Sequence, residues 1–436
     1  RWFGMESEHV VLGLLVSILI MALLLRLWRL GVYGYGNEYY AAAVKSMLQS
    51  WQNFFFIAAE PGGSVMVDKP PLGLWLQAIS AWIFGVNGFS LALPSVLAGT
   101  LSVYILYLIV KAIFNHHAAL SAAFFLAVLP GVVWVDRTNL LDSLVMCTNL
   151  IALWLLLNAI LQKKWGLLVA SFAVIGLGFN IKMMQAFLIL PAMAIVYFFG
   201  MRKIWWQRIL HLALATIVML VISFSWVLIV DLTPVENRPY VSSTNTNQMM
   251  ELVFGHNGLN RLISFREQIQ IGLKDVPNGQ SPKPPVGTQP RPGQGQQGNA
   301  PQNMPQQAGH GNDEIGTAGL FRLFQLPLAH QVSWLLGCAI LSIGLVGFIL
   351  KWQLPLQPQN QLYLMLGIWL VTEIIFFSVA DFFHAYYLLM LGAPIAGLCG
   401  LGIWGIIQLW DDESWKGFAA RSEERRVGKE CATGGR

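Results

Sequence analysis

The chain contains 436 residues, of which 56% are hydrophobic and only 11% are charged. Because soluble domains carry about 25% charged residues, this composition excludes an ordinary soluble protein and indicates an integral membrane protein. The formal net charge of +5 is small and is spread over the connecting segments, which argues against a nucleic-acid partner.

A helix needs about 20 apolar residues to span a membrane, and many segments of the chain approach this length. They are residues 9–30, 90–113, 117–135, 139–161, 165–181, 183–200, 208–230, 329–350, 361–380 and 385–410. The first is longer than the apolar core of a secretory signal and lacks a small-residue cleavage site, so we expect a retained helix. Cys147, Cys338 and Cys399 lie inside these segments, where a thiol behaves as a small hydrophobe. The sequence thus predicts an all-α polytopic membrane protein, a bundle of about ten transmembrane helices.

The first long connection, residues 31–89, contains two stretches that suit helices lying at the membrane surface. In "NEYYAAAVKSMLQSWQNFFF" (37–56), the larger apolar side chains approximate one helical face. The stretch "LGLWLQAISAWIFG" (72–85) is apolar but too short to span. We therefore expect interfacial helices in this connection, between a first span at 1–30 and the spans of residues 90–230.

The second long connection, residues 231–328, precedes the last spans at 329–410. Its middle, "NGQSPKPPVGTQPRPGQGQQGNAPQNMPQQAGHGN", has almost no apolar content and is predicted to be disordered. Residues 411–420 are expected to begin a cytosolic region. Residues 421–436 include "RSEERRVGKEC", which matches the translation of a sequencing adapter, so we expect an artefact there and a fragment of a longer protein.

The basic residues of the short connections favour a cytosolic amino terminus, which places both long connections and the turn "DRTNLLD" (136–142) outside. The ionisable and amide side chains then gather on that outer side. They are Asn37, Glu38, Asp68, Lys69, Asp136, Arg137, Asp142, Lys182, Asp231, Asp381 and His384. Because charges inside a span are costly, this grouping predicts an outward-facing polar site.

Asp68 and Lys69 stand directly before Pro70 and Pro71. The pair could be a surface salt bridge of little value. Alternatively, the prolines stiffen the segment and hold the Lys69 ammonium at the membrane surface, where it suits a lipid phosphate.

The remaining candidates also have structural interpretations. Asp142 and Glu38 could be helix-terminus charges, Arg137 and Lys182 interfacial anchors, and His384 part of an aromatic belt with Tyr387. Each residue alone is a weak indication of function. The functional interpretation depends on the placement of all these residues on the same, outer side of the membrane.

Several segments together resemble the membrane glycosyltransferases of the GT-C fold, glycosyltransferase family 39, which includes protein O-mannosyltransferases and aminoarabinose transferases. The resemblance lies in "NEYYAAAV", "VDKPPLGLWLQAISAWIFGVNGFSLALPSVLAG" and "DRTNLLDSLV". It is strongest to a bacterial branch provisionally named as mannosyltransferases, through "GLGFNIKMMQAFLILPA", "DLTPVENRPYV" and "FFHAYYLLML", and covers about residues 34–410.

The resemblance implies a multi-pass protein of the bacterial plasma membrane. It would transfer a hexose such as mannose from a polyprenyl-phosphate carrier to an envelope glycan, lipid or protein on the outer face, without a nucleotide cofactor. In the family, an acidic pair works at the acceptor and can hold a divalent metal; the matching residues are Asn37 and Glu38. Asn cannot act as a base, so the resemblance shifts that role to Glu38, with Asp68 or Asp142 as competitors, and makes Glu38 and Asp68 the candidate metal ligands.

The family's acid-Lys-Pro-Pro motif, whose lysine contacts the carrier phosphate, corresponds to residues 68–71. Asp142 and Arg137 match a polar turn, and His384 and Tyr387 fall where relatives place groups near the donor phosphate. Displacing a lipid phosphate from a sugar needs a base on the acceptor hydroxyl and positive charge on the phosphate. Lys69 with Arg137, Lys182 or His384 could supply that charge, and a single displacement would invert the anomeric carbon.

A transporter or lipid flippase is the alternative, and a scaffold without chemistry is a third possibility. A transporter would place polar residues or broken helices at mid-membrane in repeated halves. The sequence shows neither feature, so the glycosyltransferase is the preferred interpretation.

Overall fold

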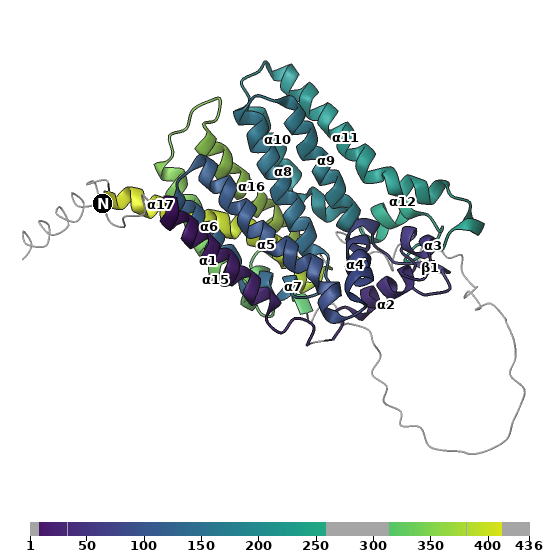
Figure 1. The fold of residues 1–436 in the computed structure, drawn as a ribbon. Helices are drawn as coiled ribbons and strands as arrows, with labels where there is room; N and C mark the ends of the chain where they lie inside the picture. Colours follow the sequence, from purple (N-terminus) through teal and green to yellow (C-terminus); the bar gives the residue numbers. More distant parts are fainter. Residues whose placement is uncertain (1–7, 33, 259–313, 381, 412–436) are drawn as a thin grey trace, which may run out of the picture.

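A computed structural model describes residues 8–32, 34–258, 314–380 and 382–411 of the chain. The expected disordered stretch, Asp381, and the expected cytosolic and adapter-derived residues from 412 onward lie outside these residues. The described part is almost entirely helical, as predicted, and has the architecture of a membrane bundle (Figure 1).

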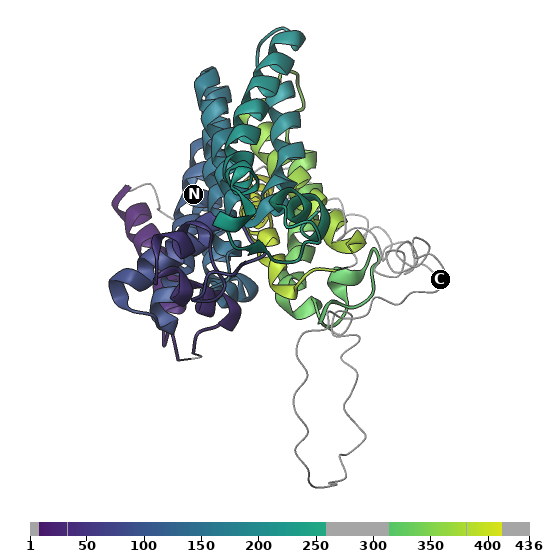
Figure 2. The same cartoon turned by 90° about the vertical axis from the view of Figure 1, so that its right-hand side faces the viewer.

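The helices of the bundle lie side by side (Figures 1 and 2). They are α1 (Glu8–Leu27), α5 (Gly88–Ile113), α6 (His116–Val128), α7 (Pro130–Asp136), α8 (Asp142–Leu161), α9 (Trp165–Lys182), α10 (Leu190–Gly200), α11 (Trp205–Leu232), α15 (Ala329–Ile349), α16 (Pro358–Val379) and α17 (Gly392–Asp411). Large apolar side chains on the outside, such as Phe348 at 85% exposure, fit contact with lipid.

The remaining elements lie mostly in the connections. These are α2 (Glu38–Met47), α3 (Trp51–Phe55), α4 (Pro71–Phe84), α12 (Met249–Glu251), the short 3-10 helices η1 (Met183–Ile189), η2 (Val235–Asn237), η5 (Arg322–Phe324) and η6 (Ala385–Leu391), the π-helical segment η3 (Leu252–His256), and strands β1 (Val65–Met66) and β2 (Tyr240–Val241). Helices α2, α3 and α4 lie together at one end of the bundle, where the sequence predicted surface helices (Figures 1 and 2).

By length and apolarity, 7 helices of the described chain could cross a membrane, or 8 if the bent pair α6–α7 counts as one span. The predicted count of ten is therefore not confirmed. Two differences reduce the ten predicted spans to eight. Residues 165–200, predicted as two spans, form one continuous apolar segment. The span predicted at 329–350 is represented by Trp334–Ile349, an apolar helix that is shorter than a full span.

The segment 165–200 reverses direction at Met183, where φ is +46°. The ring of His211 stacks on Trp165 at the start of α9, and its Nδ1 lies 2.8 Å from the hydroxyl of Tyr197 near the end of α10. Both outer ends of the segment are thus at one side of the bundle. The reversal, with Lys182 beside it, is at the other side.

A buried ion pair joins α1 to α7. The Arg26 Nε lies 2.7 Å from the Asp136 Oδ2, and both side chains are 0% exposed. The same guanidinium donates to the carbonyl oxygens of Ala22 and Ala127, each at 3.1 Å. Asp136 is therefore engaged inside the bundle and does not pair with Arg137 at the surface.

Residue chemistry at the helix starts explains several boundaries. Asn37 caps α2 by accepting from the Tyr40 N–H at 3.0 Å, and Asn87 and Ser90 form a reciprocal capping box at α5. Pro71 and Pro130 occupy the first positions of α4 and α7, where the missing N–H costs nothing.

Candidate active site

The segment Asp68-Lys69-Pro70-Pro71 is held rigidly between a strand and a helix. Strand β1 before it pairs in parallel with β2 of the second long connection, and α4 begins at Pro71 after it. The Asn257 side chain also donates to the Asp68 carbonyl at 3.1 Å. Both long connections therefore fix the position of Lys69.

Lys69 is 7% exposed, and its ammonium lies 2.6 Å from the Asp68 Oδ2. The pair predicted from the sequence thus forms, and it is largely shielded from water. A shielded pair is more than a surface salt bridge, because removing either partner leaves the other charge poorly solvated.

A second lysine pair lies nearby. Lys182, the last residue of α9, places its ammonium 2.6 Å from the Asp142 Oδ1 at the first residue of α8. Gln185 donates to the same oxygen at 3.1 Å, and the Lys182 ammonium lies 3.6 Å from the centre of the Tyr387 ring. Each charge also complements the dipole of its own helix end. The Asp142 Oδ2 is buried and has no hydrogen-bond partner in the described chain.

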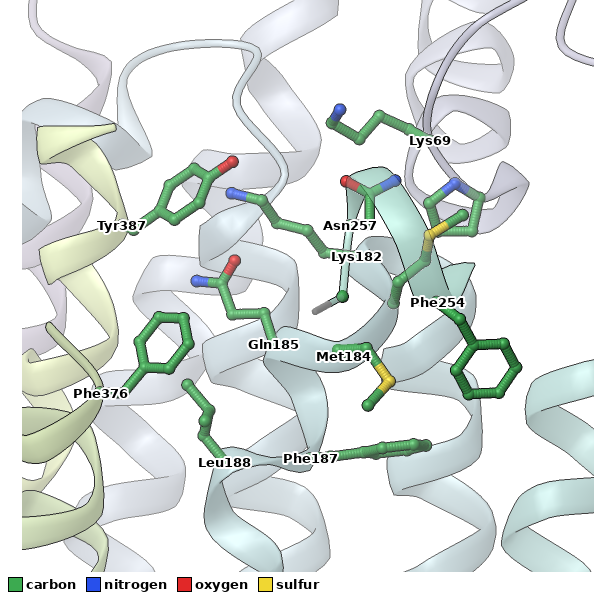
Figure 3. A pocket seen from close by; sticks show the side chains of 13 residues that line it. Lys69, Lys182, Met184, Gln185, Phe187, Leu188, Phe254, Asn257, Phe376 and Tyr387 are labelled. Carbon is green, nitrogen blue, oxygen red and sulfur yellow. The ribbon is translucent and has the colours of Figure 1, made fainter. Parts of the chain in front are cut away.

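Both lysines line one cavity of about 380 Å³ (Figure 3). Its lining residues are Lys69, Pro70, Lys182, Met183, Met184, Gln185, Phe187, Leu188, Phe254, Asn257, Gly258, Phe376 and Tyr387. Figure 3 shows the two ammonium groups and the Tyr387 hydroxyl at one end, and Phe187, Leu188 and Met184 at the other. The cavity therefore joins a cationic end to an apolar end.

Two tyrosines of α2 lie within electrostatic reach of the carboxylates of the ion pairs. Burial raises the pKa of Tyr40 well above 10.0, and the nearby carboxylates of Asp68 and Asp142 raise it further. Burial and the Asp68 charge likewise raise the pKa of Tyr39. Both phenols thus stay protonated near neutral pH and can act as hydrogen-bond donors, not as bases.

The amide pair of Asn37 and Asn139 fixes the start of α2. The Asn37 N–H donates to the Asn139 Oδ1 at 2.6 Å, and the Asn139 side-chain amide donates to the Asn37 carbonyl at 2.9 Å. Gly36, with φ of +72°, lies so close that an added Cβ would be 2.6 Å from the Asn139 Oδ1. Asn37 is therefore a helix cap here, a role that Asn fulfils as well as Asp.

Glu38 follows this cap and is exposed. It is not among the residues that line the 380 Å³ cavity. Three carboxylates were predicted as the base. Asp68 contacts Lys69 and Asp142 contacts Lys182, whereas Glu38 lies in the first turn of α2 and, within the described residues, forms no ion pair with either lysine.

Arg137 lies apart from the two lysines. It lines a second cavity of about 820 Å³, together with Asn37 and Arg29. His384 lies 3.4 Å from a carboxylate oxygen of Glu314 and stacks on the Tyr386 ring. The structure thus groups Tyr387 with the lysines, but separates Arg137 from them.

Within the described residues, no group of three or more His, Cys, Asp or Glu side chains could hold a metal ion. Asp68 faces the Lys69 ammonium, and Glu38 is exposed. The assignment of Glu38 and Asp68 as metal ligands therefore stays a prediction.

Sequence reasoning missed Gln185, Asn257 and Tyr40. Gln185 had a usable signal, because it follows Lys182 within the same polar interruption of an apolar run. Asn257 had none, since it contacts Asp68 from a position 189 residues away.

Known proteins share both the sequence pattern and the fold of this chain. Residues 68–226 match the sequence profile of the dolichyl-phosphate-mannose-protein mannosyltransferase family. Over 93% of the chain, two provisionally named mannosyltransferases of Bacillus subtilis strain 168 are similar: YycA at 38% identity and YkcB at 36%. The chain covers 65% and 63% of those relatives, just under two thirds of their length.

Among solved structures, ArnT from Cupriavidus metallidurans bound to undecaprenyl phosphate has a similar fold. Its TM-score is 0.58 at 16% identity, and the alignment covers 92% of this chain and 60% of ArnT. At this identity the likeness concerns the fold alone.

Proposed function

We propose that the chain is a GT-C membrane glycosyltransferase related to the dolichyl-phosphate-mannose-protein mannosyltransferases, whose profile matches residues 68–226. It moves a hexose from a polyprenyl-phosphate carrier to an acceptor on the outer face of the bacterial plasma membrane. The observation that supports this most directly is the cavity with two lysines at one end and an apolar wall at the other.

A polyprenyl-phosphate sugar has the matching form: an anionic phosphate joined to a long apolar chain. Lys69 and Lys182 lie where they would bind the phosphate, and the Phe187 and Leu188 side chains lie where the first isoprene units would pack (Figure 3). ArnT from Cupriavidus metallidurans binds undecaprenyl phosphate, and the shared fold makes the same class of lipid a reasonable donor here.

The proposed reaction is a displacement at the anomeric carbon. The acceptor hydroxyl attacks that carbon, the bond from carbon to phosphate oxygen breaks, and polyprenyl phosphate leaves with the bonding electron pair. The hydroxyl proton passes to a carboxylate, for which Glu38 and Asp68 are the accessible candidates. One displacement inverts the anomeric configuration, and a covalent sugar on either carboxylate would contradict this.

The lysines stabilise the phosphate as it leaves. Both lysine side chains are largely buried, and a fixed positive charge in such a position acts on the developing negative charge with little screening. Asp142 is fully buried and contacts Lys182 and Gln185, so in this proposal it positions Lys182.

The proposal is tested by transfer in proteoliposomes containing synthetic undecaprenyl-phosphate sugars, with mannose and glucose forms compared. We expect Lys69→Ala to lower transfer about 100-fold or more. Lys45→Ala is the matched control, because Lys45 is exposed on α2 and lines no part of the cavity. Equal transfer by Lys69→Ala and wild type would contradict the role of Lys69.

The same liposomes distinguish the alternative function. A fluorescent polyprenyl-phosphate lipid placed in one leaflet reports translocation. Translocation without sugar transfer would favour a flippase and overturn the proposed enzyme.

A further inference from the structure

The second cavity, of about 820 Å³, lies beyond the end of α1 and is bounded by the start of α5, by α7 and by the turn that leads into α2. Its polar side chains come from Arg29, Tyr35, Asn37, Arg137, Thr138 and Asn139. Much of the remaining wall is apolar, with Leu25, Val133 and Trp134 among its members. Like the first cavity, it combines a cationic part with an apolar part.

The charge of this cavity is positive. Among the residues that the structure describes, those that line this cavity include two arginines, Arg29 and Arg137, and no Asp or Glu. The Arg137 NH2 group donates to the Trp28 carbonyl at 2.6 Å, which fixes the guanidinium in place. The neighbouring carboxylate of Asp136 does not neutralise it, because Asp136 pairs with Arg26 inside the bundle.

Exposed tryptophans lie in and beside the lining of this cavity: Trp134 is a lining residue, and Trp28 directly precedes the lining residue Arg29. Trp28 is 70% exposed and Trp134 is 55% exposed, beside Val32 at 58%. Exposed tryptophans at the ends of membrane helices favour the headgroup region of a bilayer. A ligand of this cavity would therefore reach it from the lipid headgroups.

The first turn of α2 separates the two cavities. Asn37 lines the second cavity, whereas Tyr40, one turn later, is buried beside Asp68 and Asp142 of the first site. Glu38 lies on this same turn. A ligand in the second cavity would thus be across one helical turn from a donor in the first.

We propose that the second cavity binds the acceptor, and that this acceptor is a membrane lipid with a phosphate in its headgroup. Arg29 and Arg137 contact the phosphate, for which the guanidinium fork provides paired hydrogen bonds. The apolar wall packs against the upper part of the lipid chains. This inference rests on the proposed glycosyltransferase function, and it changes the expected role of Arg137 from donor binding to acceptor binding.

The test measures two lipids separately on the purified full chain in detergent. Native mass spectrometry reports retention of phosphatidylglycerol, and a fluorescent analogue reports undecaprenyl-phosphate binding. We expect Arg29→Gln/Arg137→Gln to lower phosphatidylglycerol retention at least about tenfold and leave undecaprenyl-phosphate binding within about twofold. Lys69→Ala should have the opposite pattern. Arg202→Gln, at an exposed arginine in the connection between α10 and α11, is the control.

Several outcomes would overturn the inference. Unchanged phosphatidylglycerol retention by the double variant removes the phosphate role of the arginines. Loss of undecaprenyl phosphate in the double variant assigns them to the donor, which keeps the proposed function but rejects the separate acceptor site. Competition by soluble glycerol 3-phosphate at the same affinity would reject a lipid ligand. Arg137→Lys keeps the positive charge and controls for misfolding. This variant should retain more phosphatidylglycerol than Arg137→Gln.

Discussion

Lys182→Met tests whether the buried pair of Lys182 and Asp142 has separable structural and chemical roles. Methionine keeps most of the apolar stem, whereas the ammonium that lies 3.6 Å from the centre of the Tyr387 ring is removed. The Asp142 carboxylate, 0% exposed, then loses the ammonium at 2.6 Å and keeps only the Gln185 hydrogen bond. Removing one partner of a buried ion pair leaves the other charge unpaired and costs about 3–5 kcal/mol. We expect the free energy of unfolding to fall by this amount.

The double variant Lys182→Met/Asp142→Asn removes both charges. Because a buried pair replaced by neutral groups is often close to neutral in stability, we expect it to lie within about 2 kcal/mol of wild type. Its transfer activity should nevertheless stay about 100-fold below wild type, since the cation that faces the phosphate is still missing. The structure thus predicts that folding is rescued and catalysis is not.

The assay is unfolding by SDS in mixed micelles, monitored by tryptophan fluorescence, followed by transfer measured on the same preparations. Lys111→Met is the charge-matched control, because Lys111 is exposed in the last turn of α5. Equal destabilisation by the single and double variants would show that the two charges are not coupled. Restored transfer in the double variant would show that Lys182 is not needed at the phosphate.

Other perturbations report on the supports of the site. Asp136→Asn should lower the unfolding free energy by about 3 kcal/mol or more, because the Arg26 guanidinium stays buried without its counter-charge; stability equal to wild type in the micelle assay would refute this. Gly36→Ala, at φ of +72°, should cost about 1–3 kcal/mol and speed amide exchange in the first turn of α2, since the new methyl meets the Asn139 side chain. Hydrogen bonds from the preceding turn hold the pKa of Glu251 below 4.5, so their stabilisation is present above that pH and lost as the pH falls through the lowered pKa. The amide protection factors of residues 245–251, which correct for the intrinsic slowing of exchange in acid, should therefore fall on acidification in wild type, and protection that does not change with pH would contradict the assignment.

The apolar segments predicted the helical membrane fold well, because span length and hydropathy are local properties of the sequence. Their number was harder to predict. Apolarity does not reveal that residues 165–200 reverse at Met183, nor how α6 and α7 bend at Pro130 by 60°. Such reversals depend on tertiary contacts, such as those of His211 with both ends of the segment.

The candidate site was predictable where chemistry is concentrated in a short motif. The Asp68-Lys69 pair and the prolines after it were recognisable because charge beside apolar sequence is unusual. Which cation meets which carboxylate was not predictable. Lys182 reaches Asp142 across 40 residues, and Arg137 faces a different cavity although it follows Asp136 directly.

The order in which the chain is synthesised has a consequence for the first cavity. Helices α8 and α9 are neighbours in sequence, so Lys182 and Asp142 can pair as soon as that hairpin has entered the membrane. The wall formed by Phe376 and Tyr387 is translated about two hundred residues later. The early pair thus keeps the Lys182 charge neutralised during biogenesis, and a nascent chain stalled before α16 should hold both lysines yet bind a lipid phosphate poorly.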